Sequence, residues 1–193
     1  MDVRDLLKVM QVQRHDFLNH LQVISGLVQL GKTDRVKEYI DRICRELQLM
    51  SNISRIKVPE IAAAMMIGNN LALERQVDID YCLKTDLNEI DIPGEILGWT
   101  MVEILKKLVN AFSFQADNRL VNLIIERLKD NYTCRISVKS SSLAEQESLE
   151  ELIKTINNKL GLYNGRVDIT IFEGRLDISL ILPAGKYICE CIG

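Results

Sequence analysis

Proline, histidine and aromatic residues are scarce in this chain. Its 193 residues include 3 Pro, 2 His and 5% aromatic residues, and the 5 Cys are an odd number with no C-x-x-C spacing. A disulfide scaffold or a structural zinc site is therefore not expected. Cys189 and Cys191 form a C-x-C near the end of the chain, and we interpret them as small buried or tail residues rather than metal ligands.

Long apolar runs and a strong excess of one charge are also missing. No stretch reaches the ~20 apolar residues that a membrane helix needs. The start, MDVRDLLKVM, is acidic and amphipathic, unlike a signal peptide. The balance of 24 Lys+Arg against 27 Asp+Glu provides no strongly basic face for nucleic acid. We therefore expect a soluble cytoplasmic protein that binds neither nucleic acid nor a membrane.

The charge is unevenly distributed along the chain. Residues 1–58 hold ten basic and seven acidic residues, a net +3, whereas residues 59–193 hold 14 basic and 20 acidic residues, a net −6. The segment between them, MSNISRIKVPE, is polar and ends near Pro59. The sequence thus predicts a boundary near 52–58, with one domain over 1–58 and a second over 59–193.

The first domain has the pattern of a helical hairpin. Apolar residues recur at spacings of four and three, interrupted only at Arg14, which is typical of a bundle seam. Gly31 is placed to end the first helix and Thr33 to cap the second, with Asp34 in its first turn. The seam positions are Val3, Leu7, Met10, Phe17, Leu21, Ile24 and Val28, then Val36, Ile40, Ile43, Leu47 and Met50. Two helices cannot bury both stripes alone, so we expect a homodimer with a four-helix bundle.

The second domain reads as mixed α/β. Helical patterns cover 59–76, 93–112 and 143–160, and residues 77–84 alternate like a half-buried strand. Two further segments predict hairpins, one turning near 129–131 and the other at Glu173-Gly174. The fold class is therefore α+β, a helical hairpin followed by an α/β sandwich with helices layered on one face of a mixed sheet.

The chemistry of the first domain centres on Arg14-His15-Asp16-Phe17-Leu18-Asn19-His20. A lone surface histidine usually has no role, but here Arg14 replaces a seam residue, Asp16 is adjacent, and Asn19 lies one turn later, within side-chain reach of His15. An exposed, largely neutral imidazole oriented by a hydrogen bond is a nucleophile at neutral pH. His15 points to the outer side of the bundle, whereas His20 flanks the seam and should be partly shielded.

These residues carry a resemblance to a known family. R-H-D-x-x-N-x-L-Q followed by GKTDRV, within residues 13–40, resembles the phosphotransfer segment of the sporulation initiation phosphotransferase B family and of citrate/malate-type sensor histidine kinases. The resemblance implies that His15 is phosphorylated. It also implies a dimeric hairpin followed by a domain derived from a kinase ATP-binding domain.

The second half departs from the active kinases of that class, which hold Mg²⁺-ATP with an asparagine-bearing helix, a D-x-G-x-G turn and a glycine-rich lid. Asn110 resembles part of the asparagine motif, but Lys106 stands where its first asparagine is expected. Lys139-Ser140-Ser141-Ser142 replaces the D-x-G-x-G turn, and 161–165 looks like an ordinary turn. We interpret this domain as a degenerate ATPase fold that has lost its ATP site.

Together with the lost ATP motifs, the resemblance implies an ATP-independent histidine phosphotransferase of a bacterial phosphorelay, with a role in sporulation initiation. His15 would carry the phosphoryl group between the aspartates of two response regulators, with Arg14, Asp16 and Asn19 assisting. No cofactor or metal of its own is expected, because each regulator supplies Mg²⁺. Two alternatives stay open: an ATP-dependent sensor kinase fragment, and a non-catalytic dimeric adaptor that binds regulators.

Overall fold

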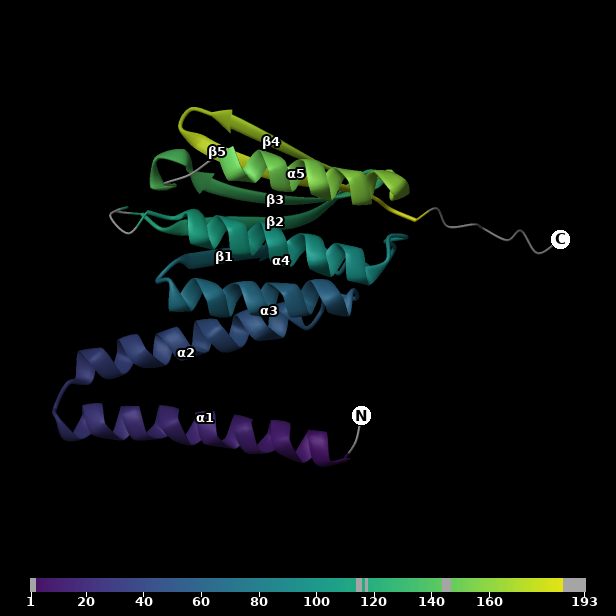
Figure 1. The fold of residues 1–193 in the computed structure, drawn as a ribbon. Coiled ribbons are helices and arrows are strands. Elements are labelled where there is room, and N and C mark those ends of the chain that lie inside the picture. Colours follow the sequence, from purple (N-terminus) through teal and green to yellow (C-terminus); the bar gives the residue numbers. More distant parts are fainter. Residues whose placement is uncertain (1–2, 114–115, 117, 144–146, 186–193) are drawn as a thin grey trace. The chain divides into compact units, whose positions relative to one another are not determined.

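The computed structural model describes residues 3–113, 116, 118–143 and 147–185 (Figure 1). The chain divides into two compact units, Met1–Leu49 and Met50–Gly193. This division falls just before the predicted boundary at 52–58, which stays a prediction. Cys189 and Cys191 lie outside the described residues, and so do the side chains of the first three seam positions.

The first unit consists of α1 (Val3–Gln29) and most of α2 (Thr33–Ile53), whose last residues, from Met50 on, belong to the second unit. Gly31 ends α1 as predicted, with a φ of 67°. Its N–H donates to Val28 O at 2.9 Å and Lys32 N–H donates to Leu27 O at 3.0 Å, the two bonds of a Schellman motif. The prediction that Thr33 caps α2 is wrong. The carbonyl of Lys32 accepts the first helical bond, from Val36 N–H at 3.1 Å, so Thr33 is already inside the helix.

The second unit contains a five-stranded mixed sheet. Its spatial order is β1-β2-β3-β5-β4, with β1 parallel to β2 and all other neighbours antiparallel. Both predicted hairpins are present, β2–β3 and β4–β5, and the second turns through Glu173 and Gly174, both at positive φ. The strands are β1 (Asp78–Leu83), β2 (Leu120–Leu128), β3 (Asn131–Lys139), β4 (Arg166–Phe172) and β5 (Arg175–Pro183).

Three helices cover one face of this sheet, α3 (Pro59–Glu74), α4 (Gly94–Ala111) and α5 (Glu147–Leu160) (Figure 1). The core lies between the layers, because alternate residues of each central strand are buried against the helices, as along Leu176, Ile178 and Leu180. The predicted α+β sandwich is therefore confirmed. The helix predicted over 143–160 begins later, at Glu147.

Helices α3 and α4 pack closely because a glycine meets the start of α3. A Cβ at Gly98 would lie 2.7 Å from the Glu60 Cβ and 2.9 Å from the Glu60 carbonyl oxygen. Any larger residue there would push the two helices apart. Among the helices of the described ranges, none combines the length and apolarity that crossing a bilayer requires.

Candidate functional site

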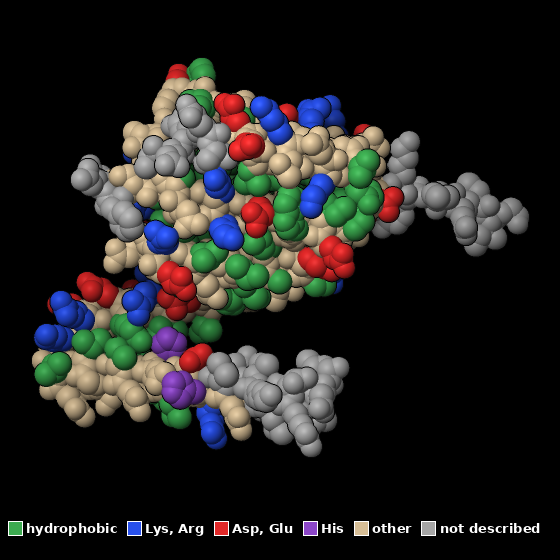
Figure 2. Space-filling model, in the orientation of Figure 1, with side chains coloured by type: hydrophobic (Ala, Val, Ile, Leu, Met, Phe, Trp, Pro, Cys, Tyr) green, Lys and Arg blue, Asp and Glu red, His purple; other side chains and the backbone are tan. Residues whose placement is uncertain are grey.

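His15 stands on α1 with most of its ring in solvent. Its side chain is 74% exposed and that of Asp16 is 62% exposed. Both histidines of the chain lie on this helix, and Figure 2 shows histidine atoms at the surface of the helical hairpin. The His15 ring is therefore accessible from solvent on the first unit.

The Nδ1 atom of His15 is held by two neighbours on its own helix. The side-chain nitrogen of Asn19 lies 3.1 Å from it, and Asp16 Oδ1 lies 3.5 Å from it. We assign the proton to Nδ1, where the Asp16 carboxylate accepts it, and turn the Asn19 amide by 180° so that its oxygen accepts the same N–H. With the proton on Nδ1, the lone pair is on Nε2, to which no group of the described chain bonds. In this arrangement Nε2 is left open to solvent.

The surface around His15 is exposed to solvent and carries both charged and apolar side chains. Arg14 is exposed and makes no ion pair with any described residue. Phe17 and Leu18, on the next turn, are 62% and 49% exposed. The structure thus brings Asp16 and Asn19 onto the His15 ring and leaves Arg14 directed at solvent, with apolar surface beside it.

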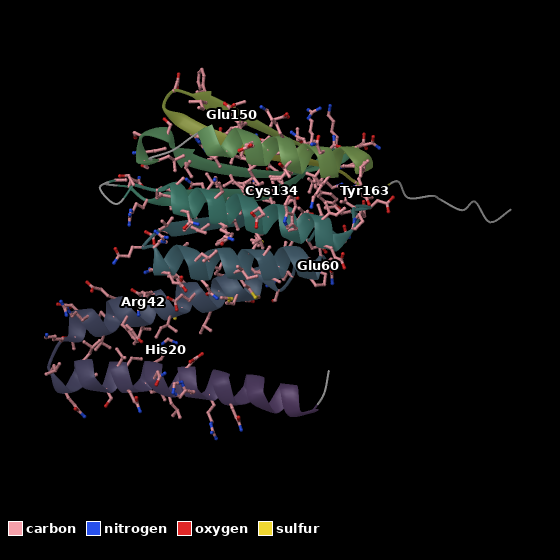
Figure 3. The ribbon with its side chains drawn as sticks, in the orientation of Figure 1. His20, Arg42, Glu60, Cys134, Glu150 and Tyr163 are labelled. Carbon is pink, nitrogen blue, oxygen red and sulfur yellow. The ribbon has the colours of Figure 1, made fainter. Side chains whose placement is uncertain are left out.

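The second histidine is engaged by the other helix. His20 Nδ1 lies 3.1 Å from the Tyr39 hydroxyl on α2, and the Arg42 guanidinium lies 4.8 Å from the centre of the Tyr39 ring (Figure 3). His20 is half-buried, as its position beside the seam predicts. Sequence reasoning missed Tyr39. The signal was present, because Tyr39 directly precedes seam residue Ile40 just as His20 precedes Leu21.

The positions that correspond to the nucleotide-binding motifs of the kinases lie on α4 and on two short 3₁₀ turns. Lys106 and Asn110 are exposed on α4. The strand β3 is followed at once by a short 3₁₀ turn, η1 (Ser140–Ser142), where the resemblance would place the D-x-G-x-G turn. A second 3₁₀ turn, η2 (Gly161–Tyr163), lies within 161–165, where the sequence predicts an ordinary turn instead of a glycine-rich lid.

The end of α4 is joined directly to the segment after β3. Phe112 and Leu143 form an antiparallel bridge, and Ser113 N–H donates to Ser142 O at 2.9 Å. The Ser142 hydroxyl donates to Asn118 O at 2.7 Å. These bonds hold the two backbones together, with neither the glycines nor the acid that a nucleotide site of this class uses.

The titrating groups with shifted pKa values belong to the second unit. The hydrogen bond between Lys84 Nζ and Glu126 Oε2, 2.9 Å long, lowers the pKa of Glu126 and raises that of Lys84. Burial raises the pKa of the Cys134 thiol to about 12, so this cysteine is a packing residue at neutral pH. Glu126 and Cys134 lie on strands of the sheet, and Lys84 is the residue directly after β1.

The comparisons with known proteins agree with this layout. Residues 1–56 match the family model described as "Sensor_kinase_SpoOB-type, alpha-helical domain". The catalytic domain of histidine kinase ThkA superposes with a TM-score of 0.54 at 9% identity, covering 66% of this chain and 94% of that one. The α/β unit therefore has the fold of histidine kinase catalytic domains. Together the hairpin and this fold relate the chain to the histidine kinases and phosphotransferases of two-component signalling.

Two curated relatives make the relationship more specific. A probable C4-dicarboxylate sensor kinase of Halalkalibacterium halodurans is 21% identical over 95% of this chain and 36% of its own length. The sporulation initiation phosphotransferase B of Bacillus subtilis is 25% identical over 60% of this chain and 59% of its own length. The chain thus spans little more than a third of the sensor kinase that it matches.

Proposed function

We propose that this protein is a histidine phosphotransferase that passes a phosphoryl group between response-regulator aspartates. The observation that supports it best is the exposed imidazole of His15, held at Nδ1 by Asn19 and Asp16. A ring fixed at one nitrogen and open at the other is suited to attack by the open one. The phosphotransferase among the relatives makes a role in sporulation initiation part of the same proposal.

The transfer proceeds in two balanced steps. The Nε2 lone pair of His15 attacks the phosphorus of a regulator's aspartyl phosphate, the N–P bond forms, and the P–O bond to the aspartate breaks with its electrons on the leaving carboxylate. The proton stays on Nδ1, where Asp16 offsets the positive charge of the ring. In the second step a carboxylate of the other regulator attacks the phosphorus, and Nε2 recovers its lone pair.

The regulators supply the rest of the site. Each brings Mg²⁺ and its own acidic pocket, so the phosphotransferase contributes only a positioned ring. Arg14 is free to meet the transferring phosphoryl group or the acidic rim of the docked regulator. The net +3 of residues 1–58 favours such docking.

The proposed phosphotransferase is a homodimer that forms through the helical hairpin. In the single chain, large apolar side chains stay exposed on both helices of the hairpin, with Phe17 at 62%, Leu21 at 46% and Leu47 at 65%. These three are seam positions that a second hairpin would cover. Such a bundle leaves His15 on its outer side, available to a regulator.

The proposal also states that the phosphotransferase works without ATP. It is supported by the bridge between Phe112 and Leu143 and by the serines of η1, which replace the acid and glycines of a nucleotide-binding turn. The chain would then receive its phosphoryl group only from a phosphorylated protein.

The test is direct transfer of label. The full chain is incubated with response regulators carrying ³²P on their aspartate, and separately with γ-³²P-ATP. We expect acid-labile, alkali-stable label on the chain from at least one regulator and no label from ATP. Label from ATP alone would favour the sensor kinase alternative, which the match to a sensor kinase over 95% of the chain supports. Regulator binding without label on the chain would favour the adaptor alternative.

A further inference from the structure

The sheet face opposite the three helices carries a groove that the proposed phosphotransfer does not use. Its volume is about 560 Å³, in the size range of small-molecule sites. It lies where β2, β3 and β5 meet η1 and the β4–β5 turn. The polar and charged residues that matter for its chemistry are Asn118, Asn122, Ser137, Lys139, Glu173 and Arg175.

Ser137 lies in the lining of this groove with an unsatisfied hydroxyl. The residue is 1% exposed, and its Oγ has no hydrogen-bond partner in the described part of the chain. Its cross-strand neighbours are Asn122 on β2 and Asp177 on β5. A buried hydroxyl without a partner is unfavourable and calls for an explanation, such as a ligand that bonds to it.

Two cations stand side by side at the same end of the sheet. Lys139 and Arg175 are direct cross-strand partners, an arrangement of like charges that destabilises a sheet. Arg175 is compensated, since its Nε donates to Asp177 Oδ1 at 3.0 Å. Lys139 makes no ion pair with any described residue. The groove lining therefore includes a lysine without an ion pair to any described residue, two positions along β3 from the unsatisfied Ser137 hydroxyl.

The walls of the groove are fixed by hydrogen bonds. Ser140 N–H donates to Gly174 O at 2.9 Å and ties η1 to the β4–β5 turn. On the other side, the Ser142 hydroxyl holds the Asn118 carbonyl at 2.7 Å. Glu173 adds a carboxylate at the turn, which suits a ligand that also carries hydroxyl or amine donors. A groove with fixed walls does not need to be ordered by its ligand.

We propose that this groove binds a small organic anion through a compact oxyanion group, a phosphate or a carboxylate. Lys139 Nζ supplies the charge, and the Ser137 hydroxyl and the Asn122 amide supply hydrogen bonds. The site lies outside the proposed phosphotransfer chemistry and does not depend on it. It would let a small metabolite bind the second unit.

The experiment is a pair of NMR titrations of the ¹⁵N-labelled full chain at constant ionic strength. Inorganic phosphate is the probe in one and acetate in the other, with chloride as the balancing salt. We expect saturable amide shifts around Ser137, Lys139 and Arg175 with at least one probe, and the probe that binds identifies the oxyanion.

Two variants make this result specific. Lys139→Gln should weaken binding at least tenfold, and Ser137→Ala should weaken it too. Arg135→Gln is the matched control for Lys139→Gln, because Arg135 lies four residues before Lys139 on β3, on the same sheet face and outside the groove. It should leave the affinity unchanged. Absence of saturable shifts with both probes, or equal loss in the Lys139 and Arg135 variants, would overturn the proposal.

Discussion

The side-chain nitrogen of Asn19 lies 3.1 Å from Nδ1 of His15, one turn further along α1. This contact needs only a single helix, because residues four apart meet on the surface of any α-helix. The contact of His20 with Tyr39, at the same length, needs two helices in register. The two histidines therefore differ in kind: one is oriented by its own helix and left open, and the other is occupied by its neighbour.

The first prediction is that His15, and not His20, carries the phosphoryl group. His15→Gln should abolish label from every phosphorylated regulator, because glutamine has no nucleophilic ring nitrogen. Folding should be unaffected, since an exposed substitution changes stability by under about 0.5 kcal/mol. His20→Gln should retain at least part of the activity. Label on the His15→Gln protein would show that another residue carries the phosphoryl group.

The second prediction concerns the orientation of the ring. Asn19→Ala removes one hydrogen bond, worth roughly 1 kcal/mol, so single-turnover phosphotransfer should slow about five- to tenfold. Asp16→Asn should slow it less, because its contact is longer, at 3.5 Å, and solvent-exposed. Gln22→Ala, an exposed change on the same helix, is the control and should transfer at the wild-type rate. Equal rates for the Asn19 and Gln22 variants would rule out the positioning role.

The third prediction is dimerisation through the hairpin. Each large apolar side chain that becomes buried contributes about 1.5–3 kcal/mol, so the exposed seam provides ample free energy for association. Leu21→Asp places a charge on the seam and should raise the dissociation constant by orders of magnitude. The adjacent change Gln22→Asp lies off the seam and should not. Sedimentation equilibrium distinguishes the two, and a folded wild-type monomer at micromolar concentration would contradict the bundle.

The fourth prediction is that Mg²⁺-ATP does not bind. The turn after β3 consists of Ser140–Ser142, and the bridge of Phe112 with Leu143 ties this segment to the end of α4. Calorimetric titration of the full chain carrying Lys139→Gln, which removes the ammonium group of the groove, should give only the heat of dilution. Saturable micromolar binding by this variant would favour the sensor kinase alternative.

The fifth prediction is a pH-dependent contribution of the Lys84–Glu126 pair. Lys84 lowers the pKa of Glu126, so the stabilisation from this carboxylate is present above its ordinary pKa of 4.5 and is lost as the pH falls through the lower, folded-state pKa. The pKa of Lys84 is raised, so its share is present below 10.5 and is lost in more alkaline solution. Glu126→Gln should therefore lower the melting temperature most between about pH 5.5 and 9.5, and the effect should shrink as the pH falls further below 4.5.

Glu150→Gln provides the matched control for that measurement. Glu150 is exposed on α5 and makes no ion pair with a described residue, so its replacement should leave the melting temperature nearly constant across the same pH range. High salt should shrink the effect of Glu126→Gln, since both partners are partly exposed, at 56% and 23%. A difference that stays constant as the pH falls below 4.5 would mean that the carboxylate acts through packing and not through charge.

Local features of this protein were predictable from the sequence because each depends on residues close together in the chain. The glycine that ends α1, the turn at Glu173-Gly174, the start of α3 at Pro59 and the spacing of Asn19 from His15 all follow from backbone preferences or from the periods of helix and strand. The fold class followed from the order of these elements. The sequence alone therefore predicts His15 and its neighbours Asp16 and Asn19.

Tertiary structure alone decided how distant segments pair. The order β1-β2-β3-β5-β4 sets Ser137 between Asn122 and Asp177, and an isolated bridge pairs Phe112 with Leu143 across a long stretch of sequence. Tyr39 reaches His20 only because the two helices align in one register. Such pairings depend on which surfaces bury one another over long sequence separations, and no local preference encodes that choice.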